Sequence, residues 1–126
     1  MPPESNEVAR LQALHAALAA RQTLTTAVRT FFIDRGFLEV QTPIRIQAPA
    51  LEDYIDAEPA GRHFLRPSPE LHMKRLLAAG YEKIFQLGPC FRQGERGQRH
   101  LPEFSMLEWY RAHADYRRIL DDTVSL

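Results

Sequence analysis

Three arginines and a histidine lie close together in the stretch 91–104, which reads Phe-Arg-Gln-Gly-Glu-Arg-Gly-Gln-Arg-His-Leu-Pro-Glu-Phe. These basic residues are Arg92, Arg96, Arg99 and His100. An arginine side chain presents a planar fork of N–H donors that fits the oxygens of a phosphate. Three such groups within eight residues suit a polyphosphate better than a single carboxylate. The alternative is a basic hairpin tip that only faces solvent.

The residues that follow alternate as a β-strand over 103–111. With a period of two, one face carries Phe104, Met106, Glu108 and Tyr110, and the other carries Ser105, Leu107, Trp109 and Arg111. We expect the second face to pack on the core. On the first, an aromatic ring can stack on a nucleobase, and a carboxylate with a phenol can hold an ammonium group. This row would suit an enzyme that joins ATP to an amino acid, whereas the alternative is that Glu108 is a surface carboxylate.

A long helix is expected over 5–35, where apolar residues recur at helical spacing. They are Val8, Leu11, Leu14, Leu18, Leu24, Ala27, Val28, Phe31 and Phe32. Ser5 or Asn6 can cap its start, and Gly36 is a typical residue for ending it. The weak helix formers over 23–26 predict a bend or a division of the helix there.

Short strands and loops are expected after this helix. Residues 37–41 form a strand that Thr42-Pro43 closes, because proline cannot donate to a sheet ladder. Prolines, a glycine and acidic residues over 44–62 indicate mostly loop, with a short strand near Tyr54-Ile55. Residues 63–66 are a second strand candidate.

A second helix is expected over 68–80, with Ser68 as its N-cap and Pro69 at its first helical position. Its inner stripe would consist of Leu71, Leu76 and Leu77. Residues 83–112 should form a hairpin of two strands, in which Pro89 marks an edge or a bulge.

Asp115 can cap a last helix over 115–126. The order of helix, strands, helix, hairpin and helix is typical of an α+β fold with an antiparallel β-sheet flanked by helices. We therefore expect residues 1–126 to form a single, partial domain.

The composition narrows the function class. Sixteen basic and sixteen acidic residues give a net charge of zero over 126 residues, which disfavours a nucleic-acid binder. A single cysteine, Cys90, excludes an internal disulfide and suggests a reducing, cytoplasmic location; it is expected to be buried. No apolar run suggests a membrane segment, and the five histidines lack metal-ligand spacing, so no metal site is expected.

Two segments resemble the signature motifs of the class II aminoacyl-tRNA synthetases. Residues 91–104 are similar to motif 2, which reads Phe-Arg-x-Glu, a variable loop, then His or Arg-x-x-x-Phe. The helix region 5–35 with the strand 35–44 resembles motif 1. Between them, residues 68–75 resemble the Ser/Ala-Pro-Glu-Leu helix start of the lysine-specific branch.

Within that branch, residues 95–97 and 106–111 look most like the paralogues that attach β-lysine to a lysine of elongation factor P. A lysyl-tRNA synthetase would carry an anticodon-binding domain before motif 1, where this chain is expected to be helical. The resemblance therefore implies a ligase that uses ATP and a lysine-like amino acid, with elongation factor P rather than tRNA as the acceptor. It also implies a homodimer through the motif 1 region.

The resemblance assigns the ATP-binding residues. Arg92 would contact the α-phosphate and act as the catalytic residue, neutralising charge while the amino acid carboxylate attacks and pyrophosphate leaves. His100, with Arg99, would reach the β- and γ-phosphates. Phe104 would stack on adenine, and Glu95 would hold the adenine amino group.

The amino acid would be bound by residues from both segments, namely Ser68, Glu70, Glu108 and Tyr110.

Two positions depart from the family pattern: Gly94 stands where glutamate is usual, and Leu101 stands where asparagine is frequent. The family's motif 3, Gly-x-Gly-x-x-Arg, does not occur in these residues, and the magnesium ligands are expected outside them. We therefore expect this chain alone to be inactive in adenylation. The alternatives are a fragment of a tRNA ligase and a non-catalytic dimerisation or binding module.

Overall fold

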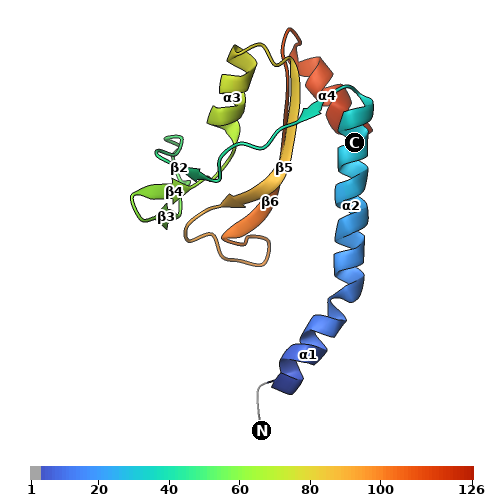
Figure 1. Cartoon of the computed structure of the whole chain (residues 1–126), viewed down its shortest axis with the longest axis vertical. Coiled ribbons are helices and arrows are strands. Elements are labelled where there is room, and N and C mark those ends of the chain that lie inside the picture. The colour runs from blue at the N-terminus through green and yellow to red at the C-terminus, as the bar shows by residue number, and fades with distance from the viewer. Residues whose placement is uncertain (1–3) are drawn as a thin grey trace.

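The computed structural model describes residues 4–126. Two helices, α1 (Glu4–Ala13) and α2 (His15–Asp34), form a bent rod beside the rest of the chain (Figure 1). The bend lies at Leu14, not over 23–26, so the predicted position was wrong. Thr23 and Thr25 donate their hydroxyl protons to the backbone oxygens of Ala19 and Gln22, and the helix continues through both residues.

The predicted cap at the start of this rod was wrong, whereas the predicted glycine at its end was confirmed. Helix α1 already includes Ser5 and Asn6, so neither residue stands before the helix as a cap. Gly36 ends α2 as expected, with a φ of +76°. Its N–H donates to Ile33 O at 2.9 Å and the N–H of Phe37 donates to Phe32 O at 3.0 Å, the pattern of a Schellman motif.

The main sheet is built from β1 (Leu38–Glu39), β5 (Lys83–Phe91) and β6 (Glu103–Arg111), in the order β1-β5-β6. Strands β5 and β6 form the predicted antiparallel hairpin, with Gln86 opposite Glu108. The prediction of an antiparallel sheet was wrong for β1, which pairs with β5 in parallel. A parallel pair needs a long crossover, and the segment between the two strands, which contains helix α3 (Glu70–Ala78), provides it.

A second, small sheet lies on the far side of the hairpin from α2 (Figure 1). Its strands are β2 (Arg45–Ile46), β4 (His63–Leu65) and β3 (Pro59–Ala60), in the order β2-β4-β3. Strand β4 was predicted, whereas β2 and β3 are too short for any alternation to show. The expected strand at Tyr54-Ile55 was wrong, because Tyr54 turns the chain with a φ of +67°.

The core lies where the end of α2 meets the main sheet. Phe32 is fully buried and stacks on Phe85 of β5 at 4.9 Å between ring centroids. Leu107 and Trp109 of β6 pack against this cluster, which confirms the packing face predicted for that strand. The row that begins at Phe104 therefore lies on the opposite face of the hairpin.

Helix α3 buries Met73 completely, while Leu71 is exposed, so Leu71 was wrongly placed in the inner stripe. The helix begins one residue later than predicted. The hydroxyl of Ser68 accepts the N–H of Glu70 at 3.2 Å. This serine therefore still provides a partner for a backbone N–H that has none within the helix.

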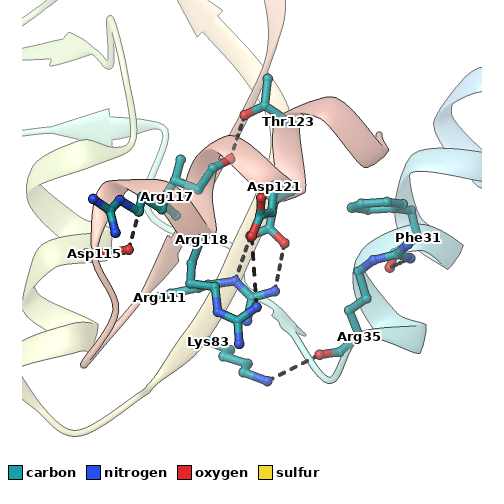
Figure 2. A network of polar contacts seen from close by, with 11 residues as sticks. Phe31, Arg35, Lys83, Arg111, Asp115, Arg117, Arg118, Asp121 and Thr123 are labelled. Carbon is teal, nitrogen blue, oxygen red and sulfur yellow. Dashed lines mark hydrogen bonds and ion pairs between the residues drawn. The ribbon is translucent and has the colours of Figure 1, made fainter.

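A network of polar contacts connects helix α4 (Tyr116–Ser125) to the end of β6 (Figure 2). Arg111 donates from Nε and Nη2 to the two carboxylate oxygens of Asp122, at 2.6 and 2.7 Å. The side chain of Asp115 accepts the N–H of Arg117 at 3.1 Å, which confirms its predicted role as the N-cap.

Candidate active site

The loop between β5 and β6 is closed by its own backbone. The N–H of Arg92 donates to Pro102 O at 2.9 Å, and the N–H of Gly97 donates to His100 O at 3.1 Å. Arg92 thus directly follows β5, which ends at Phe91, and it is half-buried and donates weakly to Pro67 O at 3.4 Å. The hairpin register fixes Phe104 nearby, opposite Cys90.

The five residues that the sequence suggested for ATP binding line one pocket of about 150 Å³. They are Arg92, Glu95, Arg99, His100 and Phe104, and Leu101 completes the wall. The guanidinium carbon of Arg92 lies 5.2 Å from the centre of the Phe104 ring. Arg96 lines a different pocket, on the side of Glu58 and Phe91. Two of the three loop arginines therefore converge on one space, and the third does not.

The loop conformation shows how Glu95 can supply the carboxylate that the family pattern places at position 94. Gly94 has a φ of +77°, a region that residues with a side chain rarely adopt. Glu95, the next residue, directs its carboxylate to Arg92, with 3.7 Å between Oε1 and Nη1. The acidic group is thus present in the pocket, one position later than in the family pattern.

A second polar group lies further along β6. The hydroxyl of Tyr110 donates to Glu108 Oε1 at 2.5 Å. Burial raises the pKa of Glu108, while the hydrogen bond from Tyr110 opposes that shift. Burial and the same bond also raise the pKa of Tyr110 far above its usual value. The phenol therefore stays protonated and holds one oxygen of the carboxylate in place.

Helix α3 brings further charges to this group. Glu70 lies close enough to raise the pKa values of both Glu108 and Tyr110, although each responds mainly to its own burial. Lys74 forms an ion pair with Glu70, and its charge also acts on Glu108. This role of Lys74 was not predicted from the sequence, although its spacing of four residues from Glu70 on a helix could have suggested it.

The carboxylate of Glu52 also raises the pKa of Glu108 slightly, so the loop 44–62 contributes to the field around the site. Three carboxylates therefore act on the same region with only one lysine among them. The fourth predicted substrate residue, Ser68, uses its hydroxyl to hold the backbone of Glu70.

Cys90 is fully buried, and this burial raises the pKa of its thiol, in line with the structural role expected from the sequence. Within residues 4–126, no group of three or more His, Cys, Asp or Glu side chains could hold a metal ion. No helix in that range is long and apolar enough to cross a membrane.

The family model for tRNA synthetases class II (D, K and N) matches residues 7–125. The chain belongs to the class II aminoacyl-tRNA synthetases. Among curated relatives, the elongation factor P–(R)-β-lysine ligase of Pasteurella multocida is 44% identical over 119 residues, which cover 86% of this chain and 37% of that protein. The ligase of the same name from Yersinia enterocolitica is 45% identical over 123 residues, with 88% and 37% covered. The chain thus spans just over a third of the length of these relatives.

Proposed function

We propose that this chain provides part of the active site of a ligase that activates a lysine-like amino acid with ATP and transfers it to elongation factor P. The observation that carries the proposal is that one hairpin presents two separate polar groups, a pocket lined by cations and a carboxylate–phenol pair. The pocket at Arg92 and Phe104 precedes the half-buried carboxylate–phenol pair of Glu108 and Tyr110 along the same face of β6. The names of the relatives support the choice of acceptor.

The first group suits a nucleotide. The guanidinium of Arg92 lies near both the carboxylate of Glu95 and the ring of Phe104, and Arg99 and His100 line the same space. An adenine stacked on Phe104 would place its phosphates toward these cations. Arg92 would then stabilise charge on the α-phosphate as the amino acid carboxylate attacks it and pyrophosphate leaves.

The second group suits the ammonium groups of a lysine-like substrate. A half-buried carboxylate with a raised pKa, such as that of Glu108, is stabilised when a cation binds beside it, because the cation favours the charged form. An uncharged analogue would leave Glu108 and Glu70 without that partner, which provides selectivity. Ser68 would act indirectly, by holding the start of α3 and with it Glu70.

Magnesium is expected to accompany ATP in this class of enzymes. The residues described here do not form a metal site, so they do not fit the role of its ligands. The phosphate contacts proposed above depend only on Arg92, Arg99 and His100.

A second proposed property is self-association through α1 and α2. Large apolar side chains on this rod are exposed, namely Val8, Leu11, Leu18 and Leu24. Exposed apolar patches of this kind often mark protein interfaces. We propose that these exposed side chains hold two copies of the chain together. Such a dimer would also be consistent with a non-catalytic dimerisation module. Sedimentation velocity at micromolar concentration tests this, and a monomer at that concentration would contradict it.

A thermal shift series tests the ligase proposal without requiring catalysis. ATP, lysine and a non-hydrolysable lysyl-sulfamoyl adenylate are added separately to the chain and to the Arg92→Ala and Glu108→Gln variants. We expect the adenylate analogue to raise Tm most, since it contacts both groups. Arg92→Ala should reduce the response to ATP, and Glu108→Gln the response to lysine. If no compound raises Tm, these residues do not form a binding site in this chain.

A further inference from the structure

A partly open pocket of about 120 Å³ lies beside β5, among the segments that follow β1 and β4. None of the residues assigned above to ATP or the amino acid lines it. Its wall includes Thr42, Ile44, Arg66, Gln86, Gly88 and Pro89. Since Gln86 pairs with Glu108 in the hairpin, its side chain lies on the same face of the sheet as Glu108, on the neighbouring strand.

Arg66 is a buried cation whose hydrogen-bond partners are all neutral. Its side chain donates from Nε to Pro89 O at 3.0 Å and from Nη1 to Thr42 O at 2.7 Å and Thr42 Oγ1 at 3.0 Å. Only 3% of Arg66 is exposed, and none of the ion pairs within residues 4–126 includes it. A buried charge is costly unless an opposite charge accompanies it.

Gln86 adds a second donor to the same space. Its Oε1 accepts the N–H of Thr42 at 2.8 Å, which fixes the orientation of the side-chain amide. The other end of that amide, Nε2, is buried and has no partner, and the residue is only 2% exposed. An unpartnered donor of this kind is uncommon in a folded protein and points to a missing acceptor.

Gly88 keeps the space between these two donors open. A Cβ atom on this residue would stand 3.0 Å from Arg66 Nη2 and 4.0 Å from Gln86 Nε2. Gly88 does not have a positive φ, so its backbone conformation does not require glycine. The absence of a side chain therefore leaves a vacant volume flanked by one charged and one neutral N–H donor.

We propose that this pocket binds a carboxylate group. Two oxygens on one carbon match two donors that flank a single space, and the negative charge compensates Arg66. A volume of this size equals roughly four water molecules at about 30 Å³ each, enough for a carboxylate and one or two carbon atoms. An ordered water would satisfy the donors but would leave the charge of Arg66 uncompensated.

A formate titration at constant ionic strength, followed by ¹H–¹⁵N NMR, tests the proposal. We expect saturable shifts of the Arg66 Nε–H and Gln86 side-chain amide signals, with smaller changes when chloride replaces formate. At ten times the Kd, the Tm should rise by about 5 °C. Equal responses to chloride and formate would overturn the choice of a carboxylate.

Two variants connect the response to this pocket. Gly88→Ala places a methyl group between the donors and should abolish the shifts and the rise in Tm. Gly97→Ala is the matched control, because a Cβ there meets nothing within 4 Å and φ is not positive, so it should respond like the wild type. Gln86→Glu places a carboxylate at the pocket wall, retains the acceptor for Thr42 N–H, and should also abolish the response. A Gly88→Ala variant that binds formate as well as Gly97→Ala does would refute the proposal.

The carboxylate could come from a small molecule or from an acidic side chain of a second copy of this chain. Sedimentation with and without formate distinguishes these sources. If a second copy provides it, formate and Gly88→Ala should each reduce association; if a small molecule does, association should not change. Signals that are insensitive to formate, together with association that Gly88→Ala does not affect, would leave water as the occupant and overturn the proposal.

Discussion

Replacing Asp122 by alanine removes both acceptors of the Arg111 guanidinium and detaches α4 from the end of β6. Both bonds are short, at 2.6 and 2.7 Å, and the side chain of Asp122 is only 6% exposed. Removing one member of a buried ion pair costs about 3–5 kcal/mol, because the other charge stays buried without a partner.

Solvent reduces this cost, since the Arg111 side chain is 18% exposed. We therefore expect Asp122→Ala to lower the free energy of unfolding by about 2–4 kcal/mol. With an unfolding entropy of about 2.1 cal/mol/K per residue, this corresponds to a fall in Tm of roughly 8–15 °C. Urea and thermal denaturation at pH 7 measure both quantities.

The neighbouring residue provides a matched control. Asp121 lies 3.9 Å from Arg118 in a pair whose side chains are 68% and 71% exposed, so Asp121→Ala should cost less than about 0.5 kcal/mol. The pH dependence gives a second check. Hydrogen bonds from Arg111 lower the pKa of Asp122, so the pair stabilises the fold fully above about pH 3.9 and loses its effect as pH falls through the lower folded-state pKa. Equal stabilities of the two variants at pH 7 would refute this reasoning.

Three further predictions concern the core, the substrate site and the proposed interface. Phe32→Ala removes a fully buried ring and should cost about 3–5 kcal/mol in urea denaturation; a cost below 1 kcal/mol would mean that the core is not centred there. Glu108→Gln should weaken binding of the lysyl-sulfamoyl adenylate about 10- to 100-fold in calorimetry, with ATP affinity unchanged. Because the pKa of Glu108 is raised, wild-type affinity should also fall as pH drops through that pKa, whereas the variant should show no such fall. Leu24→Glu should shift a sedimenting dimer to monomer, and an unchanged sedimentation coefficient would exclude this side chain from the interface.

The strand and helix boundaries that position the site could be predicted from the sequence because local residue patterns determine them. The alternation over 103–111 assigned Trp109 to the core face, and Gly36 and Asp115 marked the ends of helices through their own backbone and side-chain chemistry. Family motifs also grouped residues that the loop brings around one pocket, such as Arg92 and Phe104.

What the sequence did not reveal depends on contacts between distant segments. The parallel pairing of β1 with β5 joins residues more than forty positions apart, such as Leu38 and Ile84. The effect of Glu52 on Glu108 and the isolation of the Arg66 charge arise in the same way. Local patterns such as hydrophobic periodicity contain no information about these pairings.

The most direct test of the proposed active site is a ¹H–¹⁵N NMR titration of this chain with lysyl-sulfamoyl adenylate. The proposed function requires one hairpin to carry both a nucleotide pocket and an ammonium-binding carboxylate. We predict saturable shifts, with one common Kd, of the signals of Arg92 and Phe104 at the loop and of Glu108 and Tyr110 along β6. Shifts confined to the loop arginines, or no saturable shifts at all, would contradict the claim.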